Sequence, residues 1–292
     1  MAYFLLFLIV AMIFPCKYYD KCSSVGVDTV NVITKYNLLR HITGTLVGVV
    51  VIACFGIKLH FNSLTLLISF MYSLMLVVAI YLTIYAYQHT TVAITSIFCT
   101  ASLIVPIIFG TFLFGDTITI SQIFWIILMF VGIYFITSTN EKSEHKFTIK
   151  VFFVLVAILV VFGLGSVSMQ LFTNYVPMGD PAVFMFFAYV FATLILLVLM
   201  PFVSVKGQAE RKAPVKSYVF GALAAVFTYL SEHLMTTLTA HIPSPILFTV
   251  VNGSYIIGAA LVGTVWFKER LTIKNIAGII IATVSIILIN LI

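Results

Sequence analysis

Charged residues are scarce in this sequence. Asp, Glu, Lys and Arg together make up 8% of its 292 residues, whereas they make up roughly a quarter of a soluble globular domain. Hydrophobic residues make up 62%, and the mean hydropathy is +1.21. So few charges cannot cover the surface of a soluble protein, and the sequence therefore predicts an integral membrane protein.

The sequence also lacks the short motifs of nucleotide, metal and nucleophilic chemistry. It contains no G-x-x-x-x-G-K-S/T loop, no H-E-x-x-H pair and no G-x-S-x-G turn. The basic residues are scattered among loops and form no nucleic-acid-binding stripe. We therefore expect no cofactor, no resident metal, no nucleic-acid partner and no ATP-driven cycle.

Cysteine usage gives no redox or metal signal. The four cysteines show neither C-x-x-C pairing nor zinc-ligand spacing: Cys16, Cys22, Cys54 and Cys99. Packing as small apolar side chains is their expected role. Cys16 and Cys22 flank KYYDK, and their spacing is compatible with a disulfide between them as well as with two free thiols.

Long apolar runs separated by short polar breaks predict ten transmembrane helices. Each run is close to the ~20 residues that cross the hydrocarbon core. The first run has no positive n-region and no A-x-A cleavage site, so we interpret it as a membrane helix and not as a removed signal peptide. The expected spans are 2–21, 30–56, 63–87, 91–114, 120–138, 151–175, 182–203, 217–240, 244–267 and 273–291.

The two halves of the chain repeat. FGDTITISQI (114–123) aligns with FKERLTIKNI (267–276) at an offset of 153 residues. The strongly hydrophilic stretch at mid-chain predicts a first repeat over 1–139, a connector over 140–150 and a second repeat over 151–292. Five helices per repeat is an odd number, so the second repeat enters the membrane from the opposite side. The predicted fold is an all-α integral membrane protein of ten helices in two inverted five-helix repeats.

Lys and Arg are strongly biased to one side of this topology. The loops after the odd-numbered spans hold twelve of the fifteen basic residues, whereas the other side holds only Lys58 and the second span holds Lys35 and Arg40. The positive-inside rule then places the odd loops in the cytoplasm and both termini outside. The twelve are Lys17, Lys21, Lys142, Lys146, Lys150, Lys206, Arg211, Lys212, Lys216, Lys268, Arg270 and Lys274.

Two segments carry a family resemblance. TSIFCTASLIVPIIFGTFLFGDTITISQIFWIILMFVGIYFI (95–136) has small polar residues, a Pro, an F-G-D motif and a returning helix, and 248–288 is similar to it with F-K-E. Both resemble the end of an EamA-type repeat of the drug/metabolite transporter superfamily. MAYFLLFLIVAMIFPCKYYDKC resembles the first helix of a bacterial branch of that family.

The resemblance implies a ten-helix transporter with a central cavity built from both halves. Members of this family move small metabolites, amino acids, nucleotide sugars or drugs. Many members have their termini in the cytoplasm, which is opposite to the orientation that the Lys and Arg count predicts here.

Glu232 is the leading candidate for a site residue, because it lies about 15 residues into the eighth span. A charge at that depth costs at least ~2.5 kcal/mol, so the acid must face a cavity, pair with a cation or be protonated. Tyr229 and Thr236 share its helical face, and we interpret this face as a cavity wall. Packing of a neutral acid is the alternative. The adjacent His233 either lines the cavity edge or packs against a neighbour.

Arg40 is the second charge placed deep in a span, about 15 Å from the start of its helix. An anionic substrate group or Glu232 would be its partner, and an Arg here is also common in the resembled family. Lys35 can extend to the surface. Lys17 and Gln170 could gate the inner mouth of the cavity or could lie in solvent at the ends of their helices. We favour the interpretation that both are solvated residues at helix ends.

Further candidates lie on three other spans. Cys99, with Ser96 and Ser102, corresponds at the offset of 153 to a second polar trio that contains Asn252 and Tyr255. The two trios would meet near the midplane, although helix–helix hydrogen bonding explains small polar residues equally well. Near the end of the third span, Tyr85 and Gln88 fit either substrate stacking or an interfacial aromatic belt.

These observations favour a secondary transporter in the cell membrane, either the inner or the plasma membrane. It would move a small polar metabolite, amino acid-like or another small organic solute, by alternating access, with proton coupling through Glu232 as a further hypothesis. A flippase for a lipid-linked precursor, with Arg40 on the phosphate, is the alternative. An intramembrane enzyme using Ser166 of GLGSVS and His233 or His241 is a remote one.

The expected partners are a small-molecule substrate and the lipid bilayer. The small-residue stripe of Gly278, Ala282 and Ser285 favours close helix packing. That packing is either internal or forms a homodimer.

Overall fold

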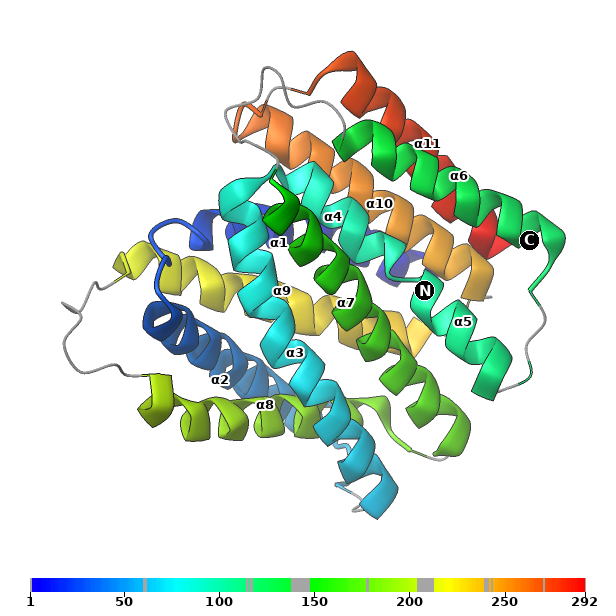
Figure 1. The fold of residues 1–292 in the computed structure, drawn as a ribbon. Helices are drawn as coiled ribbons and strands as arrows, with labels where there is room; N and C mark the ends of the chain where they lie inside the picture. The colour runs from blue at the N-terminus through cyan, green and yellow to red at the C-terminus, as the bar shows by residue number, and fades with distance from the viewer. Residues whose placement is uncertain are drawn as a thin grey trace.

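The computed structural model describes residues 2–59, 62–113, 115, 118–137, 148–176, 179–203, 213–238, 242, 244–269 and 271–291. Within these residues the chain is all-helical and contains no strand (Figure 1). The helices are α1 Ala2–Ser23, α2 Val30–Phe55, α3 Ser63–His89, α4 Val92–Ala101, α5 Ile104–Leu113, α6 Ile120–Thr137, α7 Ile149–Tyr175, α8 Pro181–Val203, α9 Val215–Leu238, α10 Ser244–Val265 and α11 Ile273–Leu291.

The fourth expected span is broken into α4 and α5. Pro106 explains the break, because its ring clashes with the carbonyl of residue i−4, Ser102, and it cannot donate a backbone hydrogen bond. The Ser102 carbonyl accepts instead from the N–H of Val105 at 3.0 Å. With α4 and α5 taken as one interrupted span, the described helices correspond to the ten that the sequence predicts.

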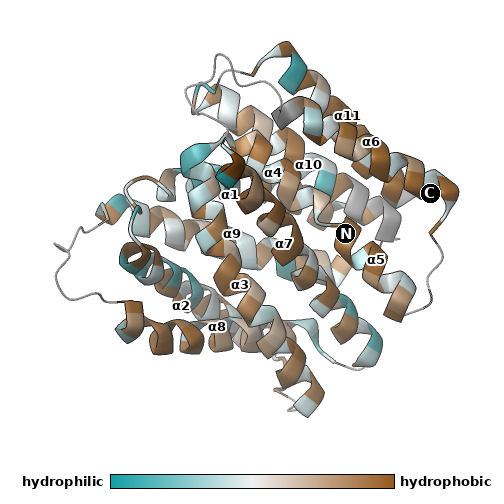
Figure 2. Cartoon of the chain, viewed as in Figure 1, coloured by the Kyte–Doolittle hydropathy of each residue, from teal (hydrophilic) through white to brown (hydrophobic). Residues whose placement is uncertain are grey.

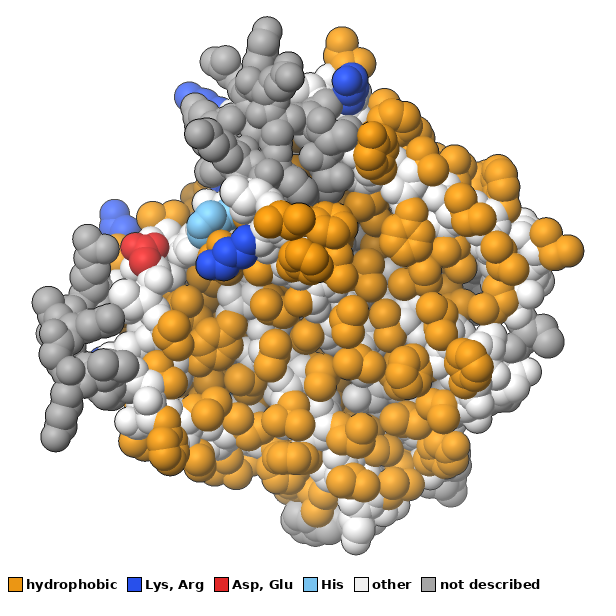
Figure 3. All heavy atoms as spheres, in the orientation of Figure 1, with side chains coloured by type: hydrophobic (Ala, Val, Ile, Leu, Met, Phe, Trp, Pro, Cys, Tyr) orange, Lys and Arg blue, Asp and Glu red, His pale blue; other side chains and the backbone are white. Residues whose placement is uncertain are grey.

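The helices have the length and surface of membrane spans. Six of them, with α4 and α5 taken together, are at least 18 residues long and strongly apolar, and 120–135, 250–265 and 273–289 are shorter apolar helices. Hydrophobic residues predominate along the helices (Figure 2). The face seen in Figure 3 is covered largely by apolar side chains, and the charged side chains that it shows gather toward its upper left. The chain is therefore a multi-pass helical membrane protein.

The helices of the two halves pair in a repeating pattern. Adding 153 to the start of α6, Ile120, gives Ile273, where α11 begins. By the same offset α1 corresponds to α7 and α3 to α9, and α1 packs along α9 as α7 packs along α3. The helices α2 and α8, α4 and α10, and α6 and α11 also pack on their counterparts. Inversion of the second repeat and the domain boundaries remain predictions.

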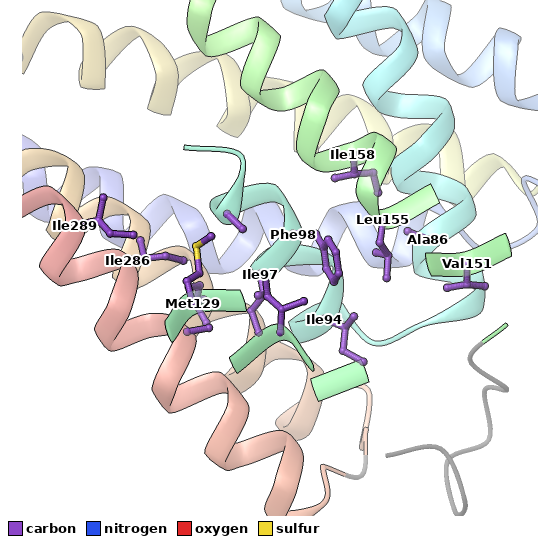
Figure 4. Packing of buried hydrophobic residues seen from close by; sticks show 14 residues of the cluster. Ala86, Ile94, Ile97, Phe98, Met129, Val151, Leu155, Ile158, Ile286 and Ile289 are labelled. Atoms are coloured by element: carbon purple, nitrogen blue, oxygen red, sulfur yellow. The ribbon is translucent and has the colours of Figure 1, made fainter. Parts of the chain in front are cut away.

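The largest buried cluster lies where the halves meet. It joins α4 to α6, α7, α10 and α11, with Ile97, Phe98, Met129, Leu155 and Ile286 at its centre (Figure 4). The small-residue stripe on α11 serves this packing, because a Cβ added at Gly132 of α6 would lie 2.9 Å from the Gly278 carbonyl oxygen and 3.1 Å from the Ala282 Cβ. The stripe is therefore covered within the chain.

Two glycines one turn apart on α2 allow close approach of aromatic rings from α8 and α9. A Cβ at Gly44 would overlap the Tyr189 ring, and a Cβ at Gly48 would lie 2.9 Å from the Tyr229 hydroxyl oxygen. This spacing of small residues four apart is typical of tight helix contacts in membranes. The two glycines thus position both tyrosines in the interior.

We predict that Gly44→Ala destabilises the protein, because the added methyl group must displace the Tyr189 ring. Overpacking of this kind costs roughly 1–3 kcal/mol. Thermal unfolding in detergent micelles would measure the change. Gly253→Ala is the matched control, since its Cβ would meet no atom closer than 3.5 Å. Equal melting temperatures for the two variants would contradict the proposed packing.

Candidate substrate site

Glu232 lies among tyrosines from four helices. Tyr189 of α8 hydrogen-bonds to its carboxylate. Tyr72 of α3, Tyr229 of α9 and Tyr255 of α10 are close enough to interact with it electrostatically. The sequence identified Tyr229 and Tyr255 as candidates. It gave no signal for Tyr72 and Tyr189, because a single tyrosine in an apolar run looks like any core aromatic.

The residues around Glu232 on α9 have distinct positions. Tyr229 is fully buried, and its ring lies edge-on to that of Tyr189 with 5.2 Å between centroids. The centroid of the His233 ring lies 6.1 Å from that of Phe55, so this ring packs against a neighbour, which is one of the two positions considered for it. Thr236 belongs to α9, but its side chain lies outside the described part of the structure.

Arg40 has a partner that the sequence did not suggest. Its Nη1 donates to the Asp20 carboxylate at 2.5 Å and to the Tyr36 hydroxyl at 3.1 Å, and its Nη2 donates to Thr228 at 3.4 Å. Both charged side chains are nearly buried, with 11% and 12% of their area exposed. Asp20 is thus the ionic partner of Arg40, a role for which the sequence suggested Glu232 or an anionic substrate. Arg40 also interacts electrostatically with Glu232.

Lys17 is buried and not a solvated helix end, which corrects the interpretation favoured from the sequence. Only 7% of the residue is exposed, and its ammonium group lies 4.9 Å from the centroid of the Tyr255 ring. The thiols of Cys16 and Cys99 are also within electrostatic range. The sequence could not show this burial, because Lys17 lies only six residues from the end of α1.

Several buried polar atoms near these residues have no hydrogen-bond partner among the described residues. They include Ser96 Oγ on α4, Asn252 Nδ2 on α10, Gln170 Oε1 on α7 and the Tyr229 hydroxyl. Buried polar groups without partners are costly. Ser96 lies one turn from Cys99, and Asn252 lies one turn from Tyr255. Of the candidates predicted at the meeting of the two halves, Ser96 and Asn252 therefore have unused hydrogen-bonding capacity, whereas Cys99 and Tyr255 pack against hydrophobic clusters.

Tyr85 and Gln88 lie elsewhere, at the end of α3. The Tyr85 ring stacks on His89 with 4.1 Å between centroids, and the Lys150 ammonium group lies 5.1 Å from it. Gln88 donates to the carbonyls of Ser24 and Val27 at 2.9 and 3.0 Å. These contacts fit the aromatic-belt alternative for Tyr85 and a role for Gln88 in fixing the loop between α1 and α2.

Charged contacts tie the two halves together at the end of the molecule that holds the odd loops. Lys21 pairs with Glu269 at 3.6 Å and donates to the Tyr87 carbonyl at 2.5 Å. Both oxygens of Glu269 accept from the Val92 N–H, at 3.1 Å, at the start of α4. Burial raises the pKa of the Glu269 carboxyl, and Lys21 and the Val92 N–H oppose that rise. Glu269 is the acid of the F-K-E motif.

A hollow opens at the opposite end. It has a volume of about 370 Å³ and is lined by Lys58, Asn62, Thr65, Val176, Gly179, Asp180 and Val183. These residues belong to the loops after α2 and α7 and to the helices beside them. Asp180 is within electrostatic range of both Tyr229 and His233. The hollow therefore lies on the side of the interior where Glu232 lies.

The serine of GLGSVS is hydrogen-bonded within its own helix. The Ser166 hydroxyl donates to the Phe162 carbonyl one turn earlier in α7, at 3.2 Å. His241, one of the two bases considered for it, lies outside the described residues. All four cysteines are free, so the disulfide left open between Cys16 and Cys22 is absent.

Comparison with known proteins finds a partial similarity to a multidrug resistance protein. The sequence is similar to "Multidrug resistance protein EbrA" of Bacillus licheniformis, with 34% identity over 62 residues. The match covers 21% of this chain and 59% of the relative. No family model matches the sequence.

We predict that Asp20→Asn destabilises the protein more than the double substitution Asp20→Asn with Arg40→Gln. The single change leaves a buried guanidinium without its anion, which costs roughly 3–5 kcal/mol, whereas the double change removes both charges. Melting temperatures of the two single variants and the double variant would measure the coupling. Additive losses would show that the two side chains do not depend on one another.

Proposed function

We propose that this protein is a secondary transporter that moves a small organic solute across the membrane by alternating access. The observation that carries the proposal is the acid Glu232, held inside the membrane among tyrosines from α3, α8, α9 and α10. Acids inside a bilayer are costly, and they mark substrate or proton paths. Tyr72 belongs to the first half and the other three tyrosines to the second.

Two further observations support a transporter. Each helix of the first half packs on a helix of the second half, as is expected of internal repeats. Many transporters bind substrate where such repeats meet. The partial relative carries the name of a multidrug resistance protein, and the EamA resemblance of 95–136 and 248–288 points to the same broad class. An EamA-type fold with inverted repeats therefore belongs to the proposal.

The arrangement of the two ends supports one particular state of the transport cycle. The contacts of Asp20 with Arg40 and of Lys21 with Glu269 close the end of the odd loops. The hollow beside Asp180 lies at the other end. By the Lys and Arg count the closed end is cytoplasmic, so we assign this conformation to the outward-facing side of the cycle.

Glu232 also supports coupling to protons. Substrate and proton would compete for one carboxylate, so that release of one favours binding of the other. The titratable and charged groups facing this carboxylate are Arg40 and the hydroxyls of Tyr72, Tyr189, Tyr229 and Tyr255. Carboxylates inside membrane spans are the groups that commonly take part in proton relays.

A lipid-linked-precursor flippase remains the second candidate because of a lateral groove. This groove of about 260 Å³ lies between α1 and α10 and is lined by Phe14, Pro15, Tyr18, Tyr19, Val262 and Trp266. Its lining carries no charge that would bind a phosphate, and Arg40 is paired with Asp20. The groove therefore supports flipping less well than the interior site supports transport of a solute.

We predict solute-driven proton flux in liposomes that contain the protein and an internal pH-sensitive dye. At least one member of a panel of amino acids, sugars, nucleosides and organic cations should change the internal pH. Glu232→Gln should abolish the change, because an amide cannot carry the proton. Asp28→Asn is the control, since Asp28 is an exposed acid outside the spans. Transport by Glu232→Gln with unchanged pH dependence would exclude coupling through this residue, and the absence of flux and of uptake for every solute would contradict transport.

A further inference from the structure

The first helix is interrupted by Pro15, which lies inside α1. Proline has no backbone N–H to donate, and its ring clashes with the carbonyl of residue i−4, here Ala11. Helices kink at such positions. Pro15 therefore forms a hinge between residues 2–14 and the last two turns of α1, residues 16–23, which are the terminal segment of this helix.

The two parts of α1 are held by different kinds of contact. Before the hinge, Leu6 and Ile9 belong to an apolar cluster with side chains of α9 and α10, and Ile13 is fully buried. After the hinge, Asp20 pairs with Arg40 of α2 at 2.5 Å. The terminal segment thus depends on directional polar contacts, whereas the rest of the helix is packed by apolar side chains.

Lys21 makes the second ionic contact of the terminal segment. Its ammonium group lies 3.6 Å from the Glu269 carboxylate and donates to the carbonyls of Tyr87 and Thr90, at 2.5 and 3.3 Å. Glu269 in turn accepts from the Val92 N–H. Lys21 and Glu269 therefore tie the terminal segment to the end of α3, the start of α4 and the loop after α10. The two ion pairs, of Asp20 and of Lys21, form a latch.

An apolar groove lies on the face of α1 that points away from Asp20. At 3.6 residues per turn, the positions 14, 15, 18 and 19 lie on the side of the helix opposite to position 20. The terminal segment therefore has space beside its hinge, on the side away from the Asp20–Arg40 pair. The groove has a volume of about 260 Å³ and is lined by Phe14, Pro15, Tyr18, Tyr19, Val262 and Trp266.

The second half of the chain lacks both the hinge and the charges at the corresponding positions. The side chains of Ser168, Thr173 and Asn174 each donate to a carbonyl one turn earlier in α7, at 3.0, 2.7 and 3.0 Å. They make these contacts within their own helix, where the terminal segment of α1 contacts its neighbours. At the offset of 153, Pro15, Asp20, Lys21 and Arg40 correspond to Ser168, Thr173, Asn174 and Thr193.

The backbone donor of the latch is missing from the second half as well. Val92, whose N–H binds Glu269, corresponds at the same offset to Pro245. Proline has no N–H. The odd-loop end is therefore closed by contacts that the equivalent positions of the other repeat cannot form.

We propose that the terminal segment of α1 is the gate of the odd-loop end, hinged at Pro15 and held by a latch that makes closure of this end the resting state. The proposal rests on the transport function proposed above and assigns the element that moves in it. Closure is favoured because the latch stabilises one end of the molecule, and opening separates two ion pairs that are largely buried.

The test is the rate at which Cys16 reacts with a sulfonatoethyl methanethiosulfonate reagent in the purified full-length protein. Cys16 begins the terminal segment and is 5% exposed, and its sulfur lies 3.4 Å from the Thr228 hydroxyl oxygen. The reagent therefore reaches this thiol when the segment moves. Serine replaces the other three cysteines, and mass spectrometry of the intact protein follows the modification.

Substitutions in the latch and in the hinge should change this rate in opposite directions. Glu269→Gln removes the charge but keeps an oxygen for the N–H at the start of α4, and should raise the rate at least about tenfold. Pro15→Ala restores the helix and should lower the rate at least about threefold, also in the presence of Glu269→Gln. Asn174→Ala is the matched control, because Asn174 is the exposed counterpart of Lys21, and should leave the rate unchanged. Elution as a single symmetric peak in size-exclusion chromatography checks that each variant is folded.

The outcomes separate the gate from the transport function. An unchanged rate in Glu269→Gln, or an equal increase in Asn174→Ala, would overturn the latch, and an unchanged rate in Pro15→Ala would overturn the hinge. Solute-driven flux in liposomes would uphold transport in each of these cases. A Cys16 rate that responds to both substitutions, in a protein that moves no solute, would support the gate and contradict the transport function.

Discussion

The cost of placing a charge in a low-dielectric interior constrains every part of this structure. Lys17, Asp20, Lys21, Arg40 and Glu232 all lie within helices that cross the membrane, and each is stabilised there only by its surroundings. Asp20 with Arg40 joins α1 to α2, and Lys21 with Glu269 joins α1 to the second half of the chain. The paired charges therefore act as interhelical contacts. Glu232 instead interacts with Tyr189 and Arg40, and the Lys17 ammonium group lies over the ring of Tyr255.

The sequence predicted the spans well because apolar runs are local properties of the chain. Their number and approximate bounds agree with the structure, and Pro106 marked the place where the fourth span breaks. The offset of 153 found in two loop motifs also matches the helix pairing. The close approach of α2 to the rings of Tyr189 and Tyr229 was not predicted. The spacing of Gly44 and Gly48 is typical of a close helix contact, but it does not identify the residues that approach these glycines.

The site was predicted only in part, and the reason is again physical. Glu232 and Arg40 stood out because a charge deep in an apolar run is improbable without a purpose. Asp20, Tyr72 and Tyr189 were missed because their importance depends on partners from other helices, which no local pattern contains. Lys17 looked solvated because it lies near a helix end, yet neighbouring helices cover it. Gln88 looked like part of a polar face, but it fixes a loop.

Arg40 and Lys17 differ in how their buried charges are stabilised. Arg40 already has a carboxylate at 2.5 Å, so a second anion would have to compete with Asp20. Among the described residues, the Lys17 ammonium group contacts the face of the Tyr255 ring. Lys17, Asp20 and Lys21 share one stretch of α1, at spacings of three and four residues that place neighbours on one helical face. A displacement of Lys17 would therefore act on the same turn of helix that carries the ion pairs of Asp20 and Lys21. In the proposed cycle, binding in the interior and opening of the odd-loop end would then be coupled through the position of α1 alone.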